Sequence, residues 1–275
     1  MLKTGKLLRL RRLSLAGDDR HLLVPLDHSV SDGPIVPADK WDDLLRALVA
    51  GGADGIIVHK GRASALPPDI LKNCALVVHL SASTARSADV HAKVLVADVE
   101  EALRLGADAV SVHVNIGSDT EAQQLADLGA VARSCDAWGM PLIAMVYPRG
   151  PRIEDPRDPA LLAHLANVAA DLGADMVKTS VALPIDRMAE VVANSPIPVL
   201  AAGGPPDGSD LVEYGAAVMA TGCRGLAIGR RIFSAPSPAA LVSRLAAVVH
   251  GVPGGNDITD DMHMTNYSTI VAGVA

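Results

Sequence analysis

Short apolar runs alternate with longer amphipathic segments along most of this chain. Eight runs rich in aliphatic and β-branched residues follow one another from residue 21 onward: His21–Asp27, Gly55–Lys60, Ala75–Leu80, Ala109–Val114, Pro141–Tyr147, Asp175–Ser180, Pro198–Gly204 and Gly225–Arg230. Most of them are continuously hydrophobic, which is typical of parallel strands buried on both faces. The pattern therefore predicts eight buried parallel strands.

Helical segments separate these runs, among them Lys40–Ala50, Thr120–Trp138, Pro159–Leu172 and Pro238–His250. Gly-Ala-Asp joints ending in Asp54, Asp108 and Asp175 each close a helix with a glycine cap and lead into the next strand. Repeated βα units of this kind predict a single α/β domain, a (β/α)8 TIM barrel. A doubly wound open sheet is the alternative, but no GxGxxG motif follows an early strand.

Both ends of the chain depart from the repeat. The basic, leucine-containing N-terminus predicts a helix that packs on the barrel or on another subunit, and it lacks the features of a secretory signal. We expect residues 1–250 to form the barrel with this helix and residues 251–275 to form a loose or intersubunit tail. Val94–Val96 is expected to be an extra short strand after the third one.

Composition narrows the functional classes. A net charge of −7 gives no reason to expect a nucleic-acid partner, and no apolar run is long enough for a transmembrane helix. Three scattered cysteines fit a reducing cytoplasm. No cofactor and no metal are expected.

Ionisable residues follow the predicted strands at the ends where barrel enzymes carry their chemistry. Lys178 lies in the apolar run Met176–Ser180, where desolvation favours the neutral, nucleophilic amine that Schiff-base chemistry needs. Asp27 and Tyr147 end two other strands, and a carboxylate and a phenol can move the protons of such a reaction. Each has a structural alternative: a lysine that reaches solvent, a carboxylate that caps a loop, and an aromatic residue at the barrel rim.

The last two strands predict a phosphate site. Gly203 and Gly204 follow the seventh strand, and Gly229 and Arg230 follow the eighth, so exposed backbone N–H groups and a fixed charge can bind an anion. The predicted substrate is a sugar phosphate or a similar molecule.

Two competing assignments use the same rim. Lys60 could be the reactive amine, but the Gly61-Arg62 sequence after it is open and polar. The strand-end histidines could instead bind zinc for a metal-dependent aldolase, if suitable geometry brought together His28, His59, His79 and His113.

Longer motifs carry a resemblance to a known family. They include VPLDHSVSDGP from Val24, VHLSAST from Val78, GADAVSVHVNIGSD from Gly106, WGMPLIAMVYPRG from Trp138, DMVKTS, AAGGP and AIGRRIF. The chain resembles the class I aldolases of the deoxyribose-phosphate and archaeal-type fructose-bisphosphate aldolase superfamily over roughly residues 6–250. Within it, the chain looks like the aminoheptanoate and heptulosonate synthases that use L-aspartate 4-semialdehyde.

The resemblance implies a function and roles for individual residues. It implies condensation of dihydroxyacetone phosphate with that aldehyde, with Lys178 as the Schiff-base lysine, Tyr147 as proton donor and Asp27 as proton acceptor. It also implies substrate or phosphate contacts and a homo-oligomer; the contact residues would be His28, His113, Arg149, Gly203, Gly204, Gly229 and Arg230. The chain departs from the family at Val181–Pro184, where a tyrosine and a glycine turn are usual, and at Arg231, where asparagine is frequent.

Several functions stay open at this point. A transaldolase of aromatic biosynthesis and a fructose-bisphosphate aldolase would use the same lysine. A phosphosugar isomerase would need an acid/base pair but no imine, and a non-catalytic relative would only bind a phosphorylated ligand.

Overall fold

Eight parallel strands close into a barrel in the computed structural model, which describes residues 4–204 and 208–251. The order around the barrel is β1-β10-β9-β8-β7-β6-β3-β2. The strands are β1 (His21–Pro25), β2 (Gly55–Val58), β3 (Ala75–His79), β6 (Ala109–Ile116), β7 (Leu142–Pro148), β8 (Met176–Thr179), β9 (Val199–Ala202) and β10 (Gly225–Ala227). Every predicted run overlaps one of them, with β6 and β7 extending one or two residues further, so the predicted (β/α)8 barrel is confirmed.

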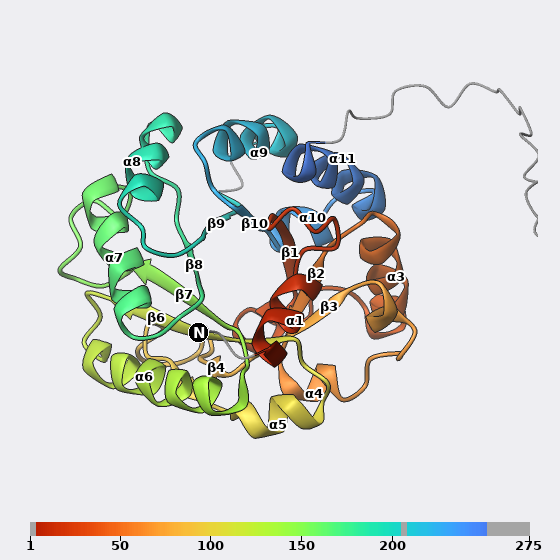
Figure 1. Cartoon of the computed structure of the whole chain (residues 1–275), viewed down its shortest axis with the longest axis horizontal. Helices are drawn as coiled ribbons and strands as arrows, with labels where there is room; N and C mark the ends of the chain where they lie inside the picture. The colour runs from red at the N-terminus through yellow and green to blue at the C-terminus, as the bar shows by residue number, and fades with distance from the viewer. Residues whose placement is uncertain (1–3, 205–207, 252–275) are drawn as a thin grey trace, which may run out of the picture.

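Helices surround the strands in a ring, as Figure 1 shows. They are α1 (Thr4–Arg12), α2 (His28–Ser31), α3 (Trp41–Ala50), α4 (Lys60–Ala63), α5 (Val99–Arg104), α6 (Glu121–Trp138), α7 (Pro159–Asp171), α8 (Met188–Ala193), α9 (Leu211–Ala220), α10 (Arg230–Phe233) and α11 (Pro238–His250). Short 3₁₀ turns lie at Ala38–Lys40, Ile70–Lys72 and Ile185–Arg187. Long α6 and α7 begin and end within two residues of the segments that the sequence predicts.

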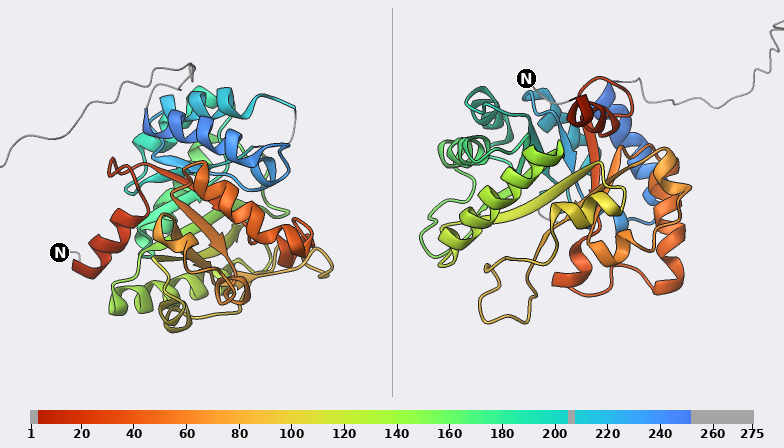
Figure 2. Two further views of the ribbon diagram at one scale, coloured as in Figure 1. Left: turned by 90° about the vertical axis from the view of Figure 1, so that its right-hand side faces the viewer. Right: turned by 60° about the horizontal axis from the view of Figure 1, so that its bottom comes forward.

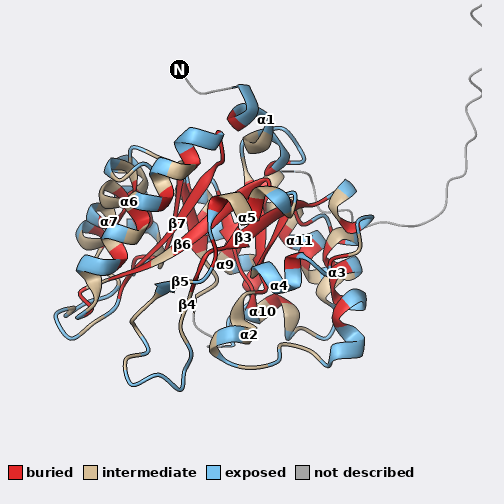
Figure 3. Cartoon of the chain, turned by 90° about the horizontal axis from the view of Figure 1, so that it is seen from below, coloured by how far each residue is buried: buried red, intermediate tan, exposed pale blue. Residues whose placement is uncertain are grey.

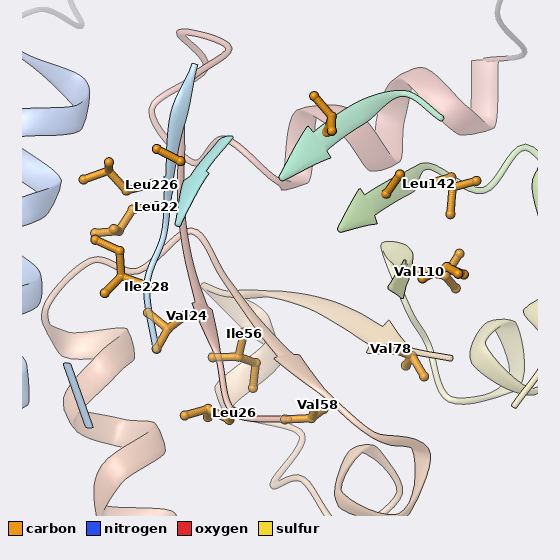
Figure 4. Packing of buried hydrophobic residues seen from close by; sticks show 14 of the residues in the cluster. Leu22, Val24, Leu26, Ile56, Val58, Val78, Val110, Leu142, Leu226 and Ile228 are labelled. Carbon is orange, nitrogen blue, oxygen red and sulfur yellow. The ribbon is translucent and has the colours of Figure 1, made fainter. Parts of the chain in front are cut away.

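The alternation of side chains along each strand divides the core into two layers. Outward-facing residues such as Leu22, Val110 and Leu142 pack against the helices (Figure 4). Inward-facing residues, among them Ile143, Met145 and Met176, form a separate cluster inside the barrel. Because Lys178 follows Met176 by two positions, its side chain also points into the barrel.

A two-stranded hairpin lies outside the barrel. Strand β4 (Ser81–Ala82) pairs antiparallel with β5 (Val94–Leu95), which confirms the extra strand predicted at Val94–Val96. The long loop between them projects beyond the helix ring in Figure 2, on the same side as α2 and α10 in Figure 3. This side carries the carboxyl ends of the barrel strands.

Helix α1 covers the opposite end of the barrel (Figure 3). Leu10 and Leu13 join the cluster inside the barrel, so the N-terminal segment packs on the barrel, one of the two positions expected for it. Exposed apolar side chains remain on this segment at Leu7, Leu8 and Leu15.

The three Gly-Ala-Asp joints explain how α1 is held. Each aspartate accepts a hydrogen bond from the backbone of the neighbouring strand: Asp54 from Leu22 N at 2.6 Å, Asp108 from Leu76 N at 3.0 Å, and Asp175 from Leu142 N at 2.8 Å. Each also binds the N-terminal segment: Asp54 lies 2.7 Å from Leu15 N, Asp108 lies 3.0 Å from Arg12 Nε, and Asp175 lies 2.7 Å from Lys6 Nζ. The repeated motif therefore fixes both strand register and the helix that closes the barrel.

The predicted tail at residues 251–275 lies outside the described residues except for Gly251, where the chain leaves α11 with a left-handed cap. Among the helices of the described residues, none combines the length and the apolar character needed to cross a membrane.

Candidate active site

The carboxyl ends of the strands surround a cavity of about 480 Å³. Every site residue expected from the sequence lines it, which brings together Asp27, His28, His113, Tyr147, Arg149, Lys178, Gly203, Gly204, Gly229 and Arg230. These residues come from the ends of β1, β6, β7, β8, β9 and β10, far apart in the chain. A volume of this size suits a small-molecule ligand.

Lys178 lies at the floor of the cavity with only 7% of its surface exposed. Its strand neighbours in register are Met145 on β7 and Leu200 on β9, both inside the barrel. Its charge interacts electrostatically with Asp27. The amine is thus desolvated by apolar neighbours and faces one carboxylate, which is an arrangement suited to a nucleophilic lysine.

Asp27 is the carboxylate that faces Lys178. Its Oδ2 lies 3.8 Å from His79 Nε2, and its Oδ1 lies 3.5 Å from His28 Nδ1 without a hydrogen bond in this geometry. Burial alone would raise the pKa of Asp27, but the charges of His79, His28 and Lys178 together lower it. Asp27 is therefore ionised at neutral pH and can accept a proton.

Four histidines of the site are neutral at pH 7. Burial is the largest cause in each case: it lowers the pKa of His79 to about 4 and lowers those of His28, His59 and His113. His79 Nδ1 contacts Ser111 Oγ at 2.8 Å, and His59 Nδ1 contacts the His79 carbonyl at 3.1 Å.

Tyr147 lies on the wall next to Lys178, with its ring packed between two side chains. The ring centroid is 5.0 Å from that of His113, and the Arg149 guanidinium lies 4.6 Å from it on a cation–π contact. His113 is held in turn by Asn115, at 2.8 Å from its Nε2. The phenol is 7% exposed, so its orientation is fixed by packing while its surface still reaches the cavity.

The glycines after β9 and β10 are required by their surroundings. Gly204 adopts φ of +68°, a left-handed conformation that disfavours other residues. A Cβ on Gly229 would lie 2.3 Å from the Pro25 carbonyl oxygen and 2.7 Å from His28. Both loops therefore bring bare backbone to the cavity wall, beside the Arg230 side chain.

Arg231, one of the departures from the family pattern, braces this region. Its guanidinium donates to the Gly203 carbonyl at 3.2 Å, to the Ser209 carbonyl, and to Ser209 Oγ at 3.3 Å. It thus ties α10 to the loop after β9. The Val181–Pro184 departure follows β8 directly, and Val181 also lines the cavity.

Two alternatives from the sequence are resolved by geometry. Lys60 is the first residue of α4, and its Nζ forms an ion pair with Glu101 at 3.0 Å on the exposed side, away from the cavity lining. Within residues 4–204 and 208–251, no three His, Cys, Asp or Glu side chains are grouped so as to hold a metal ion.

Sequence reasoning missed two cations of the cavity, Lys93 and Arg157. Lys93 immediately precedes β5 on the hairpin, and Arg157 lies in the loop between β7 and α7. Neither follows a barrel strand directly, so the strand-end rule does not identify them. The predicted strand at Val94–Val96 was the available signal, because it implied an ordered hairpin on the catalytic side.

A closed parallel barrel with a buried lysine on its sixth barrel strand, opposite a carboxylate, defines an aldolase-type site. The model of the DeoC/LacD family aldolases matches residues 21–235, and the chain belongs to this family.

Named relatives match most of the chain. It is 49% identical over 245 residues to the 2-amino-4,5-dihydroxy-6-oxo-7-(phosphonooxy)heptanoate synthase of Streptomyces griseus, covering 88% of this chain and 89% of the relative. It is 38% identical over 251 residues to the 2-amino-3,7-dideoxy-D-threo-hept-6-ulosonate synthase of Halobacterium salinarum, covering 91% of this chain and 93% of the relative.

Solved structures agree in fold and class. A Schiff-base-forming fructose-1,6-bisphosphate aldolase matches with a TM-score of 0.79 and 26% identity, over 89% of this chain and 99% of that one. An archaeal fructose-1,6-bisphosphate aldolase, with its catalytic lysine covalently bound to the carbinolamine intermediate, matches with a TM-score of 0.77 and 26% identity, over 90% and 99%.

Proposed function

We propose that this chain is a class I aldolase that joins dihydroxyacetone phosphate to L-aspartate 4-semialdehyde through an imine on Lys178. The product would be 2-amino-4,5-dihydroxy-6-oxo-7-(phosphonooxy)heptanoate. The observation that carries the proposal is the buried Lys178 facing the ionised Asp27 in a cavity that also contains Tyr147 and the two glycine loops. The Streptomyces griseus relative, named for this product, supports the choice of substrates.

The donor half of the reaction uses Lys178 and Asp27. Asp27 accepts the ammonium proton, and the neutral amine attacks the ketone carbon of dihydroxyacetone phosphate to form a carbinolamine. Loss of water gives the protonated imine. The positive iminium nitrogen withdraws electrons and so acidifies the neighbouring hydroxymethyl carbon. Removal of a proton from that carbon then gives an enamine. The backbone N–H groups around Gly203, Gly204 and Gly229, with Arg230, would hold the phosphate.

The acceptor half uses Tyr147. The enamine carbon attacks the aldehyde carbon, a C–C bond forms, and the aldehyde oxygen takes a proton from the phenol to become a hydroxyl group. Water then adds to the regenerated iminium, and release of the ketone returns the Lys178 amine. The proton lost from the donor carbon is matched by the proton gained by the aldehyde oxygen and in turn restores the phenol of Tyr147. The water released in imine formation is matched by the water consumed in its hydrolysis, so the cycle balances without a cofactor.

The test is reductive trapping. The protein would be treated with borohydride in the presence of dihydroxyacetone phosphate, digested and analysed by mass spectrometry. We expect a reduced adduct on the peptide that contains Lys178, and none in a Lys178→Arg variant, because arginine cannot form the imine. Absence of an adduct with any phosphoketone would end the Schiff-base proposal and leave an isomerase or a ligand-binding protein.

A second candidate is the transaldolase that makes 2-amino-3,7-dideoxy-D-threo-hept-6-ulosonate, favoured by the 38% identity to the Halobacterium salinarum relative. The same trapping experiment separates the two, because this enzyme would take its carbon unit from a larger ketose phosphate. An adduct formed with such a donor, but not with dihydroxyacetone phosphate, would select the transaldolase, or a fructose-bisphosphate aldolase if the donor is the hexose bisphosphate.

We also propose a homo-oligomer that works in the cytoplasm, without nucleic-acid or membrane partners. The apolar side chains of Leu7, Leu8 and Leu15 are 45%, 57% and 51% exposed at the α1 end and could be covered by a second copy. Three buried, unpaired cysteines fit a reducing compartment. Light scattering of the purified protein would give the subunit count.

A further inference from the structure

Lys93 is a partly buried cation with no ion pair among the described residues. It precedes β5 on the hairpin, lines the cavity, and donates from Nζ to Ser83 Oγ at 2.5 Å. Burying an ammonium without a carboxylate partner is costly, and side chains that bear such a cost are concentrated at functional sites. The serine orients the ammonium without neutralising it.

Arg149 brings a second unpaired cation to the same wall. Its guanidinium is held on the Tyr147 ring at 4.6 Å and forms no ion pair within the part of the chain that the structure describes. Burial lowers the pKa of Lys93, and the charge of Arg149 lowers it further, against the opposing fields of Asp27 and Asp32. The two cations also hold the pKa of His113 far below its ordinary value, after burial as the main cause. This wall therefore has a positive electrostatic potential, and a bound anion would offset the repulsion between its two cations.

Lys93 lies across the barrel from the proposed phosphate loops, and Arg149 lies between the two in the order of the strands. Those loops follow β9 and β10, whereas Lys93 belongs to the insertion after β3, and Arg149 follows β7. Lys178 on β8 and Tyr147 on β7 lie between the two regions. A ligand with an anionic group at each end could therefore place its reacting carbons near the lysine and the phenol.

We propose that Lys93, together with Arg149, binds the carboxylate of the acceptor aldehyde. The inference rests on the proposed function and deepens it. L-aspartate 4-semialdehyde carries its carboxylate at the end opposite the aldehyde, and a carboxylate accepts charge-assisted hydrogen bonds from both an ammonium and a guanidinium. The Lys93 contact belongs to a hairpin outside the barrel, so acceptor selectivity and imine chemistry are carried by separate parts of the chain.

The test compares acceptors that differ at one group. At saturating dihydroxyacetone phosphate, kcat/KM would be measured with L-aspartate 4-semialdehyde, with succinate semialdehyde, which lacks only the amine, and with butanal, which has a methyl group in place of the carboxylate. Lys93→Met should lower kcat/KM about ten- to a hundredfold for the two carboxylated aldehydes, the effect of one ionic hydrogen bond. It should change the butanal value by less than about twofold, and Lys93→Arg should restore most of the loss.

Two controls make the result specific. Lys40→Met removes an exposed lysine that pairs with Asp43 on α3, and it should leave all three acceptors unchanged. Borohydride trapping with dihydroxyacetone phosphate should give the same Lys178 adduct in Lys93→Met as in the unsubstituted protein.

The outcomes are separable. An equal loss for butanal, no loss at all, or a lost imine in Lys93→Met would each overturn the carboxylate subsite. Failure of the unsubstituted enzyme to condense L-aspartate 4-semialdehyde, with the imine still formed, would instead overturn the proposed function. In that case the pair of succinate semialdehyde and butanal still tests the subsite.

Discussion

The two ends of this barrel treat buried charge in opposite ways. At the α1 end, the carboxylates of Asp54, Asp108 and Asp175 each bind a strand amide and a partner from the N-terminal segment. At the cavity end, Lys178, Lys93 and Arg149 have no ion-pair partner among the described residues. Pairing at one end stabilises the fold, whereas unpaired charge at the other leaves groups available to a substrate.

A single strand carries paired charge at its α1 end and unpaired charge at its cavity end. Strand β8 begins at Met176, directly after Asp175, which is paired with Lys6, and only Met176 and Val177 separate Asp175 from Lys178. The barrel interior between the two ends is apolar, so substitutions at one end should leave the other largely intact. Each experiment below tests that separation.

The largest effect is expected for Lys178→Arg. Because arginine retains the charge but cannot form an imine, turnover should fall by at least about four orders of magnitude. The melting temperature should change little, because the substituted side chain lies in a cavity rather than in a packed ion pair. Activity assays and thermal unfolding of the same preparation would measure both. Turnover at the unsubstituted level would contradict the role of Lys178.

The reciprocal experiment is Asp54→Ala at the α1 end. Asp54 is fully buried and accepts from Leu22 N at 2.6 Å and from Leu15 N at 2.7 Å. Its removal leaves the buried Leu22 amide without its acceptor, and the partly buried Leu15 amide and His250 lose a partner as well, so the unfolding free energy should fall by about 3 to 5 kcal/mol. Urea unfolding would measure the loss.

Activity is the control for that variant. The fraction of Asp54→Ala that stays folded at low temperature should keep kcat within about twofold, because no cavity residue touches Asp54. A large fall in kcat at full folding would show that the two ends are coupled, and the comparison would fail. Asp54→Asn, which retains an acceptor oxygen, should lose less stability.

A smaller effect is expected from pH. The contributions of His250 at the α1 end and His79 at the cavity end to the free energy of unfolding should change with pH in opposite directions. Hydrogen bonds that His250 donates to Asp54 and to Asp18 raise the pKa of His250, against the effect of burial. Its contribution to stability is therefore present below the unfolded pKa and is lost as pH rises through the folded pKa. Burial lowers the pKa of His79 to about 4, so its contribution is lost as pH falls from about 6.5 toward 4.

Two variants separate these contributions. The difference in unfolding free energy between the unsubstituted protein and His250→Gln should be larger at pH 6 than at pH 8. For His79→Gln, the difference should shrink as the pH is lowered from 7 to 5. Urea unfolding at each pH measures both, and the same pH trend in both variants would contradict the opposite signs.

The strands and their carboxyl ends follow local patterns that can be recognised in the sequence alone. The continuous apolar runs identified all eight barrel strands, because parallel strands buried on both faces need such runs. The strand-end rule then located Lys178, Asp27, Tyr147 and the glycine loops in one cavity, since the fold brings all carboxyl ends together.

The rest depends on contacts between distant segments. The Gly-Ala-Asp motif was read from the sequence as a helix cap, but the partners of its aspartates in the N-terminal segment and in the neighbouring strands are set by tertiary packing. Lys93 reaches the cavity only because β5 pairs with β4, and Arg231 holds Ser209 and Gly203 through a contact that no local pattern encodes. A rule based on strand ends does not identify functional residues on loops and insertions.

The smallest effect is expected for Lys60→Met, which tests whether position at a strand end is sufficient for function. Lys60 follows β2 as Lys178 ends β8, but its Nζ pairs with Glu101 at 3.0 Å, and the two side chains are 45% and 33% exposed. Loss of this pair should cost less than about 1 kcal/mol of stability and leave kcat/KM within about twofold. The matched comparison with Lys178→Arg would then attribute reactivity to burial inside the barrel, whereas a large loss of turnover in Lys60→Met would show that an exposed, paired lysine takes part in the reaction.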